Sequence, residues 1–433
     1  MKRGFIEGCR KCIGLDGCFL KGISKGQLLV TIAKDGNNQI FPITWAVVET
    51  ESKDTWCWFI RILKSDFEIN DEGEELTIIS DMQKGLYSVV QEYLPECEHR
   101  MSARHILANW QQKWKGIERR NGFWSCARLT YEVELKSKLD KLSKLGHKIC
   151  EDLVNYNPEK WSKAMVRTSS KCDSVDNNMA ESFNAWVLGP RHKTIISILE
   201  EIRIKVMNRF TRVRAFADTW NEAISPMAMM VLVTNVEKSM RCTIHWNGDF
   251  GYEVKGATGI KHIVKLTEEV CSCRAWQLKR IPCAHGVAAI HHKRLNPLDF
   301  ISEWYNKETS LKVYSHFIQS VPCMEMWPES TNAKVEPSPV RTMPGRPTKK
   351  KKKEGWGDKN SGKLTERGIS MSCSICKSTA YNRRRCPNKP QSTSEKLLYV
   401  ITETGCLGMF GTAESEFSFL LNVWDCLLNV WDC

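Results

Sequence analysis

Asp16 and Asp81 are the first candidates for chemistry, because each lies in or directly after a short apolar segment. Residues 12–20 (CIGLDGCFL) carry Asp16 in their middle, and residues 76–80 (LTIIS) end just before Asp81. Both segments have the composition of buried β-strands. Carboxylates at strand ends of an α/β sheet are candidate metal ligands. The alternative is that Asp81 only caps the following helix and that Asp16 is an unrelated strand residue.

A second chemical signal is the segment VCSCRAWQLKRIPCAHGVAAI of residues 270–290. It contains two pairs of soft donors, Cys271 with Cys273 and Cys283 with His285. Four such donors suit a closed tetrahedral Zn²⁺ site that folds a small unit lacking a core of its own. A closed site leaves no position for water, so we expect this zinc to be structural. The alternative is a buried Cys-rich hairpin with an incidental histidine.

A third group, Cys373, Cys376 and Cys386, has part of the spacing of a zinc knuckle. Tyr381 stands where a knuckle would need histidine, and a phenol is a poor zinc ligand at neutral pH. Whether this degenerate knuckle binds zinc is left open.

The elements that must position the aspartates can be predicted from periodicity. Residues 27–33 and 39–49 predict a β-hairpin around the turn cluster KDGNN, and Ser52 or Asp54 can cap a helix with an apolar stripe. A right-handed crossover through that helix would make the fourth strand parallel to the first. Asp16 and Asp81 would then face each other in an α/β, ribonuclease-H-like mixed sheet.

Helical patterns follow the sheet. Leu135, Leu139, Leu142 and Leu145 are spaced for one helix, which predicts a helical insertion. The helix predicted over residues 176–188 places Glu181, Asn184 and Leu188 on one face. The next, over residues 194–210, has Ile195, Ile198, Leu199 and Ile202 as its apolar stripe.

The charge of the chain is concentrated near its end. The 433 residues carry a net charge of +13, and residues 341–386 hold fourteen Lys or Arg against three acids. A basic arm of this kind suits nucleic acid or nuclear import. Gly-Arg-Pro followed by lysines also resembles a minor-groove hook, with Arg346, Lys349, Lys350, Lys351, Lys352 and Lys353 as the nucleic-acid contacts. Nineteen scattered cysteines without a signal-peptide pattern indicate a reducing compartment, and no apolar run is long enough for a membrane span.

Five motifs in this order resemble a plant Mutator-like element (MULE) transposase with a SWIM-type zinc finger, and the far-red-response regulators derived from such transposases are also similar. The motifs are GLDGCFLKG with Asp16, SDMQKGL with Asp81, HRMSARHILANW with His105, NNMAESFNAW with Glu181, and the finger Cys271, Cys273, Cys283 and His285. The resemblance implies a catalytic set of Asp16, Asp81 and Glu181 that holds Mg²⁺ or Mn²⁺ for DNA cleavage and strand transfer. It also implies a nuclear protein whose partner is DNA with transposon terminal sequences, and which forms a homo-oligomer.

The expected organisation follows from the motifs. Residues 1–110 begin the transposase domain, 111–175 form the insertion, 176–225 return with the third acid, 235–295 hold the finger, 330–370 are a basic disordered linker, 371–390 the degenerate knuckle, and 391–433 a tail. Ser102 replaces a cysteine that the family has three residues before His105, and LLNVWDC occurs twice in tandem at the end of the tail. With the short segment before Asp16, these features predict a truncated or decaying copy that retains its carboxylates.

Two other functions are compatible with the same residues. The first is a non-catalytic nuclear DNA-binding regulator derived from a transposase, and the second is a zinc-finger interaction module on a nuclease-like scaffold. Three intact acids favour the enzyme, because a scaffold has no need for converging carboxylates.

Overall fold

A computed structural model describes residues 1–22, 25–69, 72–169, 171–257 and 259–323, together with the single residues Met326, Cys376 and Pro387. The predicted basic linker with Arg346 and Lys349 to Lys353 lies outside the described residues, as do the repeated tail and nearly all of the degenerate knuckle. No helix in the described ranges is both long and apolar enough to cross a membrane.

The first part of the chain forms a five-stranded mixed sheet with the strand order β3-β2-β1-β4-β5. β1 is antiparallel to β2 and β2 to β3, whereas β4 is parallel to both β1 and β5. The predicted parallel pairing of the first and fourth strands is therefore confirmed. The strands are β1 (Cys12–Phe19), β2 (Gln27–Lys34), β3 (Ile40–Val48), β4 (Thr77–Ser80) and β5 (Glu98–Met101).

The hairpin between β2 and β3 is closed by Asp35, whose carboxylate accepts the N–H groups of Asn37 and Gln39 at 2.9 and 2.7 Å. Asn38 adopts a positive φ of 60°, a conformation that asparagine tolerates well in turns. The KDGNN cluster therefore makes the predicted turn.

Helix α2 (Lys53–Asp66) begins at Ser52, which forms a capping box with Thr55. Its predicted apolar stripe is buried, and α2 packs against α3 (Lys84–Tyr93). The short helix α1 (Lys2–Gly8) contacts β3.

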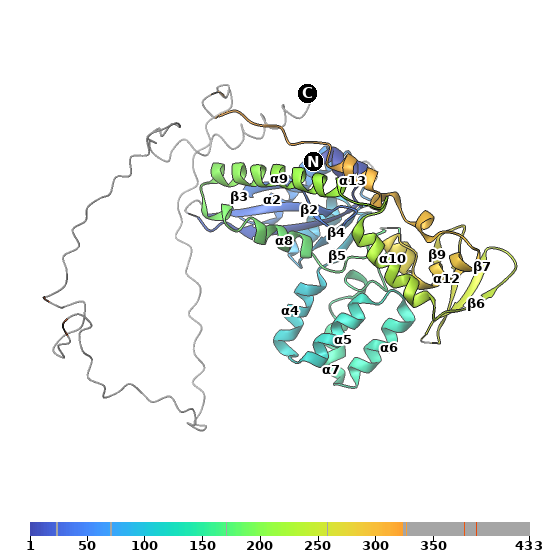
Figure 1. The fold of residues 1–433 in the computed structure, drawn as a ribbon. Coiled ribbons are helices and arrows are strands. Elements are labelled where there is room, and N and C mark those ends of the chain that lie inside the picture. Colours follow the sequence, from blue (N-terminus) through green and yellow to red (C-terminus); the bar gives the residue numbers. More distant parts are fainter. Residues whose placement is uncertain are drawn as a thin grey trace. The chain divides into compact units, whose positions relative to one another are not determined.

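Between β5 and the return to the sheet, the chain forms a helical insertion with a core of its own. Figure 1 shows its four helices side by side, and Trp110, Phe123 and Trp161 lie in their core. The helices are α4 (Ala103–Lys113), α5 (Ile117–Arg128), α6 (Glu132–Ser143) and α7 (His147–Val154), followed by the 3-10 turn Pro158–Lys160. Leu145, predicted in the stripe of α6, lies beyond that helix and is exposed, because Gly146 turns the chain at φ 146°.

Helix α8 (Asn178–Trp186) returns to the sheet and packs against β1, β2 and β3. It ends two residues before Leu188, which is exposed rather than on the helix face as predicted. The 3-10 turn Pro190–His192 leads to α9 (Ile195–Asp218), where three of the four predicted stripe residues are buried and Leu199 is half-buried.

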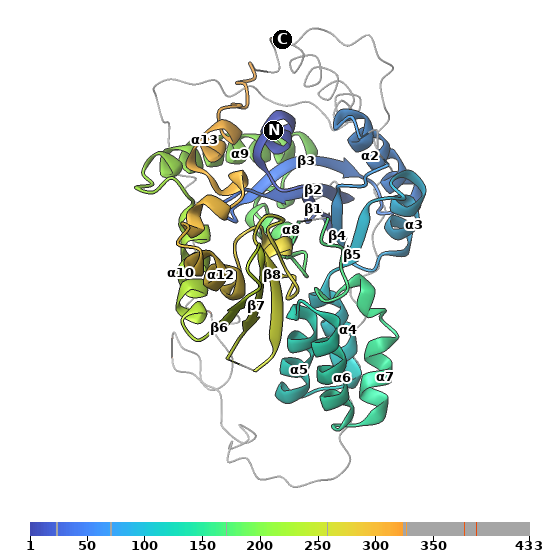
Figure 2. The same cartoon turned by 90° about the vertical axis from the view of Figure 1, so that its right-hand side faces the viewer.

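The next four strands form a second sheet with the order β6-β7-β8-β9. Helix α12 lies against this sheet (Figure 2). Its strands are β6 (Thr243–Trp246), β7 (Gly251–Lys255), β8 (Lys261–Lys265) and β9 (Val270–Cys271). Its helices and neighbours are α10 (Pro226–Ser239), α11 (Ala275–Lys279), α12 (Ala284–His292), the 3-10 turns Pro297–Phe300 and Glu303–Tyr305, and α13 (Lys307–Val313).

Helix α13 brings the chain back to the first sheet. It packs against α1 and α9, and the Tyr314 hydroxyl donates to the buried carboxylate of Asp35 at 2.9 Å. The finger is thus held between two segments that both belong to the first sheet and its helices.

Candidate carboxylate and zinc sites

Asp16 lies in β1, and Asp81 directly follows the neighbouring parallel strand β4. β1 and β4 pair with Gly14 beside Ile79, and the same register continued by two residues brings Asp16 level with Asp81. Neighbouring strands are about 4.8 Å apart. The two carboxyl groups therefore project from adjacent positions at the carboxyl end of β4.

Asp81 is not the cap of the helix that follows it. The N-cap of α3 is Gln83, whose side-chain oxygen accepts the N–H of Leu86. Among the described residues, the Asp81 carboxylate accepts one hydrogen bond, from the Gln83 N–H at 3.3 Å. This leaves most of its hydrogen-bonding capacity for another partner.

Glu181 lies on α8, the helix that packs against β1. Arg104 of α4 approaches it with an Nε to Oε2 distance of 3.4 Å, whereas the Oε1 atom is buried without a hydrogen-bond partner in the described structure. Three residues further along the same helix, Asn184 donates to Asp16 Oδ2 at 2.8 Å. The helix face that carries Glu181 is therefore turned toward Asp16.

Asn177 connects the start of α8 to β1 through a hydrogen bond. Its side-chain amide donates to the Leu15 carbonyl at 2.8 Å, and its Oδ1 lies 2.0 Å from the position that a Cβ would take at Gly14. Only glycine at this strand position lets Asn177 approach. The sequence motif around Gly14 thus serves to seat the helix that bears the third acid.

Electrostatics link the acids. Burial, followed by the charge of Asp81 and smaller effects of Glu51 and Glu181, raises the pKa of Asp16 to about 7, although the Gly17 N–H opposes this shift. Like charges gathered in a partly buried site disfavour ionisation. The carboxyl groups therefore interact, and a divalent cation between them would relieve the repulsion.

The four predicted zinc donors come together in the second sheet. Cys271 ends β9, Cys273 follows it, and Cys283 and His285 lie at the start of α12. The Cys273 and Cys283 sulfurs are 3.5 Å apart, and the Cys271 sulfur is 3.8 Å from His285 Nδ1. Tetrahedral zinc with Zn–S bonds of about 2.3 Å needs sulfurs about 3.8 Å apart, so this geometry fits zinc.

Among the described residues, this is the one group of three or more Cys, His, Asp or Glu whose donor atoms all lie within 4.8 Å of one another. The oxygens of Asp16, Asp81 and Glu181 are not gathered to that spacing. Hydrogen bonds from Cys271 and Cys283 hold the pKa of Cys273 well below its usual range, which supplies the thiolate that zinc prefers.

Comparison with known families identifies two domains in the chain. Residues 12–109 match the MULE transposase domain, a range that includes Asp16 and Asp81. The chain carries a MULE transposase domain. Residues 253–294 match the SWIM zinc finger and include all four zinc donors. The predicted combination of a MULE transposase with a SWIM finger is thus confirmed, while no curated protein matches the chain.

A fourth acid of the MULE transposase domain, Glu51, was not predicted. It lies three residues after the end of β3, and its Oε2 atom lies 2.7 Å from the position that a Cβ would take at Gly17. Trp56 Nε1 lies 3.2 Å from its other oxygen and donates to it. Burial and then the charge of Asp81 raise the pKa of Glu51. Gly17 was the available signal, because a glycine inside a strand often marks the close approach of another group.

His105 of the transposase domain lies on α4 with its Nδ1 buried and without a hydrogen-bond partner in the described residues. Ser102, which replaces the family's cysteine, accepts the Asn177 N–H at 3.3 Å through its hydroxyl. The serine therefore helps to hold the segment before α8.

The SWIM finger is attached to the helical insertion through Arg274, which lies between its zinc donors. The Arg274 guanidinium donates to the Thr130 carbonyl at 3.2 Å and also to the carbonyls of Ala164 and Val166. Because Arg274 follows Cys273 directly, the position of this contact depends on the zinc loop. Gly286 is equally constrained, since a Cβ there would lie 2.7 Å from the Trp276 ring.

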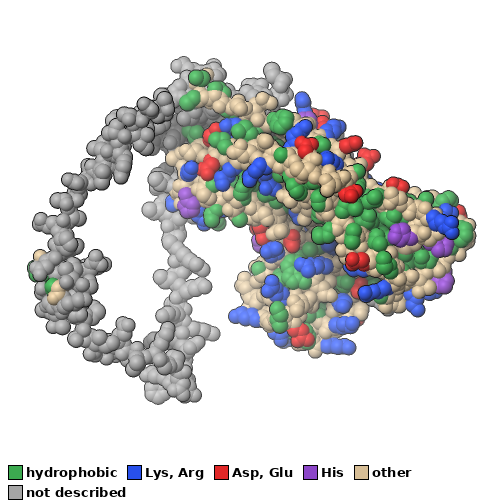
Figure 3. Space-filling model, viewed as in Figure 1, with side chains coloured by type: hydrophobic (Ala, Val, Ile, Leu, Met, Phe, Trp, Pro, Cys, Tyr) green, Lys and Arg blue, Asp and Glu red, His purple; other side chains and the backbone are tan. Residues whose placement is uncertain are grey.

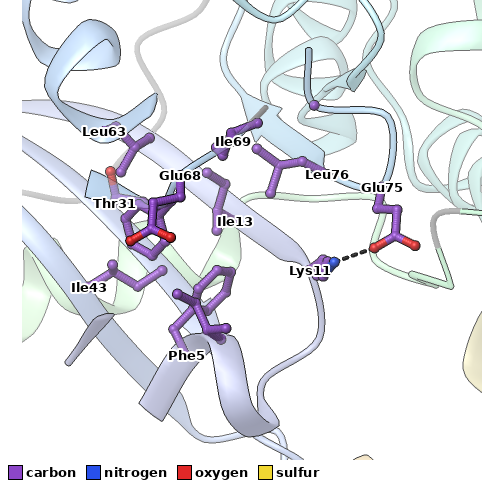
Figure 4. Close-up of a pocket in the computed structure, with 13 residues that line it drawn as sticks. Phe5, Lys11, Ile13, Thr31, Ile43, Leu63, Glu68, Ile69, Glu75 and Leu76 are labelled. Carbon is purple, nitrogen blue, oxygen red and sulfur yellow. Dashed lines mark hydrogen bonds and ion pairs between the residues drawn. The ribbon is translucent and has the colours of Figure 1, made fainter. Parts of the chain in front are cut away.

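A separate cavity of about 390 Å³ lies beside β1, between the sheet and α2 (Figure 4). Phe5, Ile13, Ile43 and other apolar side chains line it, and the Lys11–Glu75 ion pair lies at its edge. None of the four acids described above lines this cavity, so it is distinct from the carboxylate site.

Proposed function

We propose that the protein is a DDE-type transposase that cleaves DNA with Mg²⁺ or Mn²⁺ held by Asp16, Asp81 and Glu181. The observation that carries this proposal is the interaction of the three acids, from two parallel strands and a helix, inside and next to a MULE transposase domain. The strand order β3-β2-β1-β4-β5 supports the ribonuclease-H-like sheet on which such acids are expected.

The donor set suits a hard divalent cation. Carboxylate oxygens are the ligands that Mg²⁺ and Mn²⁺ prefer. Glu181 presents a buried oxygen without a hydrogen-bond partner in the described structure. The Asp81 carboxylate accepts one hydrogen bond from the described residues, so most of its lone pairs are available to a metal ion. When bound, divalent cations would activate a water or a 3′-hydroxyl and stabilise the leaving oxygen during in-line displacement.

The protein's own residues prepare this site. Asn184 and the Gly17 N–H hold the two oxygens of Asp16 in place. Asn177 seats α8 on β1, so the third acid is positioned by a rigid element rather than by a loop. Preorganised ligands of this kind need little rearrangement when the substrate binds.

The helical insertion supplies a basic surface for DNA. Between positions 103 and 155 the chain carries eleven Lys or Arg against six Asp or Glu, and Figure 3 shows Lys and Arg side chains along this part of the described surface. Lys113 lies over the Trp114 ring and Arg128 over the Trp124 ring. Basic groups interleaved with aromatic rings are suited to phosphates and unstacked bases.

We further propose transposon terminal sequences as the DNA partner, a homo-oligomer as the active assembly, and the nucleus as the location. Deletion of residues 344–353 from a fluorescent fusion should reduce nuclear accumulation if the basic segment is an import signal. Unchanged affinity of the deleted protein for A·T-rich DNA would remove the groove-binding role of Arg346.

The decisive experiment is nicking of supercoiled DNA by purified full-length protein. We expect activity with Mg²⁺ or Mn²⁺ that is lost in Asp81→Asn and retained in Glu74→Gln, an exposed acid just before the same strand. A wild-type protein that binds DNA but never nicks it would contradict the proposal.

The Arg104–Glu181 ion pair favours one alternative, a non-catalytic DNA-binding regulator. A cation from the protein already partly neutralises the third acid, which would suit a chain that has no use for metal there. In that case Arg104→Ala should leave DNA binding unaffected and produce no nicking, whereas an enzyme should retain its activity in this variant.

A further inference from the structure

Two buried cysteines from distant parts of the chain face each other at the start of β1. Cys12 is the first residue of β1, and Cys172 lies in the segment 171–177 that leads into α8 without regular secondary structure. Their sulfurs are 2.8 Å apart, and their exposed fractions are 6% and 1%. A disulfide bond is about 2.05 Å long, so the sulfurs need to move together by less than about 1 Å.

The segment around Cys172 is fixed on both sides of the thiol. The buried guanidinium of Arg100 donates to the carbonyls of Cys172 and Ser174, at 2.9 Å each. Asp173, between them, forms ion pairs with Arg10 at 3.1 Å and Lys279 at 3.2 Å. With these neighbours held, the Cys172 side chain has little freedom to turn away from Cys12.

The surroundings of the pair favour a reactive sulfur. The hydrogen bond with Cys12, followed by the charges of Arg100 and Arg10, lowers the pKa of Cys172 to about 5, although burial opposes the shift. The thiolate is the form of cysteine that attacks oxidants. Cys12 lies within reach as a resolving thiol, with its sulfur 2.8 Å from that of Cys172.

We propose that Cys12 and Cys172 form a reversible thiol–disulfide site that is oxidised by hydrogen peroxide and reopened by thiols. The Cys172 sulfur attacks one peroxide oxygen, the O–O bond breaks, and a sulfenic acid and one water form. The Cys12 sulfur then attacks the Cys172 sulfur, the S–S bond forms, and the hydroxyl leaves with a proton as a second water. The two thiols lose two electrons in total, and the peroxide gains them.

The site links the strand that carries Asp16 to the segment that leads to Glu181. The two cysteines are 160 residues apart, so the disulfide closes a loop that contains most of the transposase domain and the whole helical insertion. Cross-links across long loops restrict the unfolded chain most. This inference goes beyond the proposed function and does not depend on DNA cleavage.

The test uses the full chain with its zinc bound and hydrogen peroxide as the oxidant. After graded oxidation, free thiols are alkylated, the protein is digested without reduction, and cross-linked peptides are identified by mass spectrometry. We expect a Cys12–Cys172 peptide pair that disappears after dithiothreitol. The oxidised protein should also unfold several degrees higher than the reduced protein.

The control is Cys97→Ser, which removes another buried thiol of the same domain and should leave the cross-link intact. Cys172→Ser and Cys12→Ser should each abolish it, together with the thermal shift. If wild-type protein shows no Cys12–Cys172 peptide at any peroxide concentration, or if Cys172 proceeds to sulfinic acid without a cross-link, the inference is wrong. Both of these results are measured on the wild-type protein and so do not depend on whether the variants fold.

Discussion

Replacing Asp16 by asparagine should stabilise the protein in Mg²⁺-free buffer even though it removes a proposed catalytic acid. Burial and neighbouring acids raise the pKa of Asp16 from 3.8 to about 7. Between these values the unfolded state loses the proton while the folded state keeps it. The free energy of unfolding therefore decreases as the pH rises through this window, so the protein becomes less stable, and the whole penalty is present above about pH 7.

The magnitude follows from the shift. About three pKa units at 1.36 kcal/mol each correspond to about 4 kcal/mol, and partial exposure of the Asp16 side chain reduces this to about 2 kcal/mol. Asparagine has only one oxygen for the two donors, Gly17 N–H and Asn184, which costs about 1 kcal/mol. We expect a net gain of about 1 kcal/mol at about pH 8 and none at about pH 5.

Urea unfolding at several pH values, with bound zinc retained, measures this difference directly. Addition of Mg²⁺ should flatten the pH dependence of the wild type and leave that of Asp16→Asn unchanged. A variant that is less stable than the wild type by the same amount at every pH would refute the raised pKa of Asp16 in the folded protein.

Three other perturbations have defined outcomes. Cys283→Ala should reduce the zinc content from about one ion per chain to none, as measured by metal analysis, and natively purified wild type without zinc would contradict the site. Gly17→Ala should displace Glu51, since the new Cβ would lie 2.7 Å from its carboxylate. We expect the free energy of unfolding to fall by about 1–3 kcal/mol and Mn²⁺ to bind more weakly, as measured by calorimetry. Unchanged Mn²⁺ binding would mean that Glu51 has no role in the metal site. Asp173→Asn should destabilise the protein by about 3–5 kcal/mol in urea unfolding, because Arg10 would remain buried without its anion. A cost below about 1 kcal/mol would mean that the other neighbours of Arg10 are enough to compensate its buried charge.

The elements of the first sheet could be predicted because each has a local signal. The apolar composition around Asp16, the KDGNN turn and the stripe of α2 all depend on neighbours within a few residues, and the structure confirms each element. The parallel pairing of β1 and β4 was predictable because a crossover helix leaves few other topologies. The four zinc donors could be predicted for the same reason, since all of them lie within fifteen residues of the sequence.

What could not be predicted depends on contacts between distant residues. Glu51 reaches the acids because Gly17 leaves room for it, and nothing near Glu51 in the sequence announces that approach. Leu188 and Leu145 continue a helical spacing past the end of the helix, and periodicity alone does not say where a helix stops. The Cys12–Cys172 contact joins residues that only the folded chain brings together.

The position of α8 in the chain also bears on synthesis. Asp16 and Asp81 can come together once β4 has been synthesised and pairs with β1. Helix α8 is synthesised only after the whole helical insertion, about 100 residues later. At about 5–20 residues per second, a ribosome needs several seconds or more to cover that distance. During this interval the nascent chain has two acids but lacks the third. It also lacks Asn184, which donates to Asp16, and Asn177, which holds α8 on β1. The order of the elements thus delays assembly of the site until the insertion has been made, and a chain that stops early carries an incomplete set.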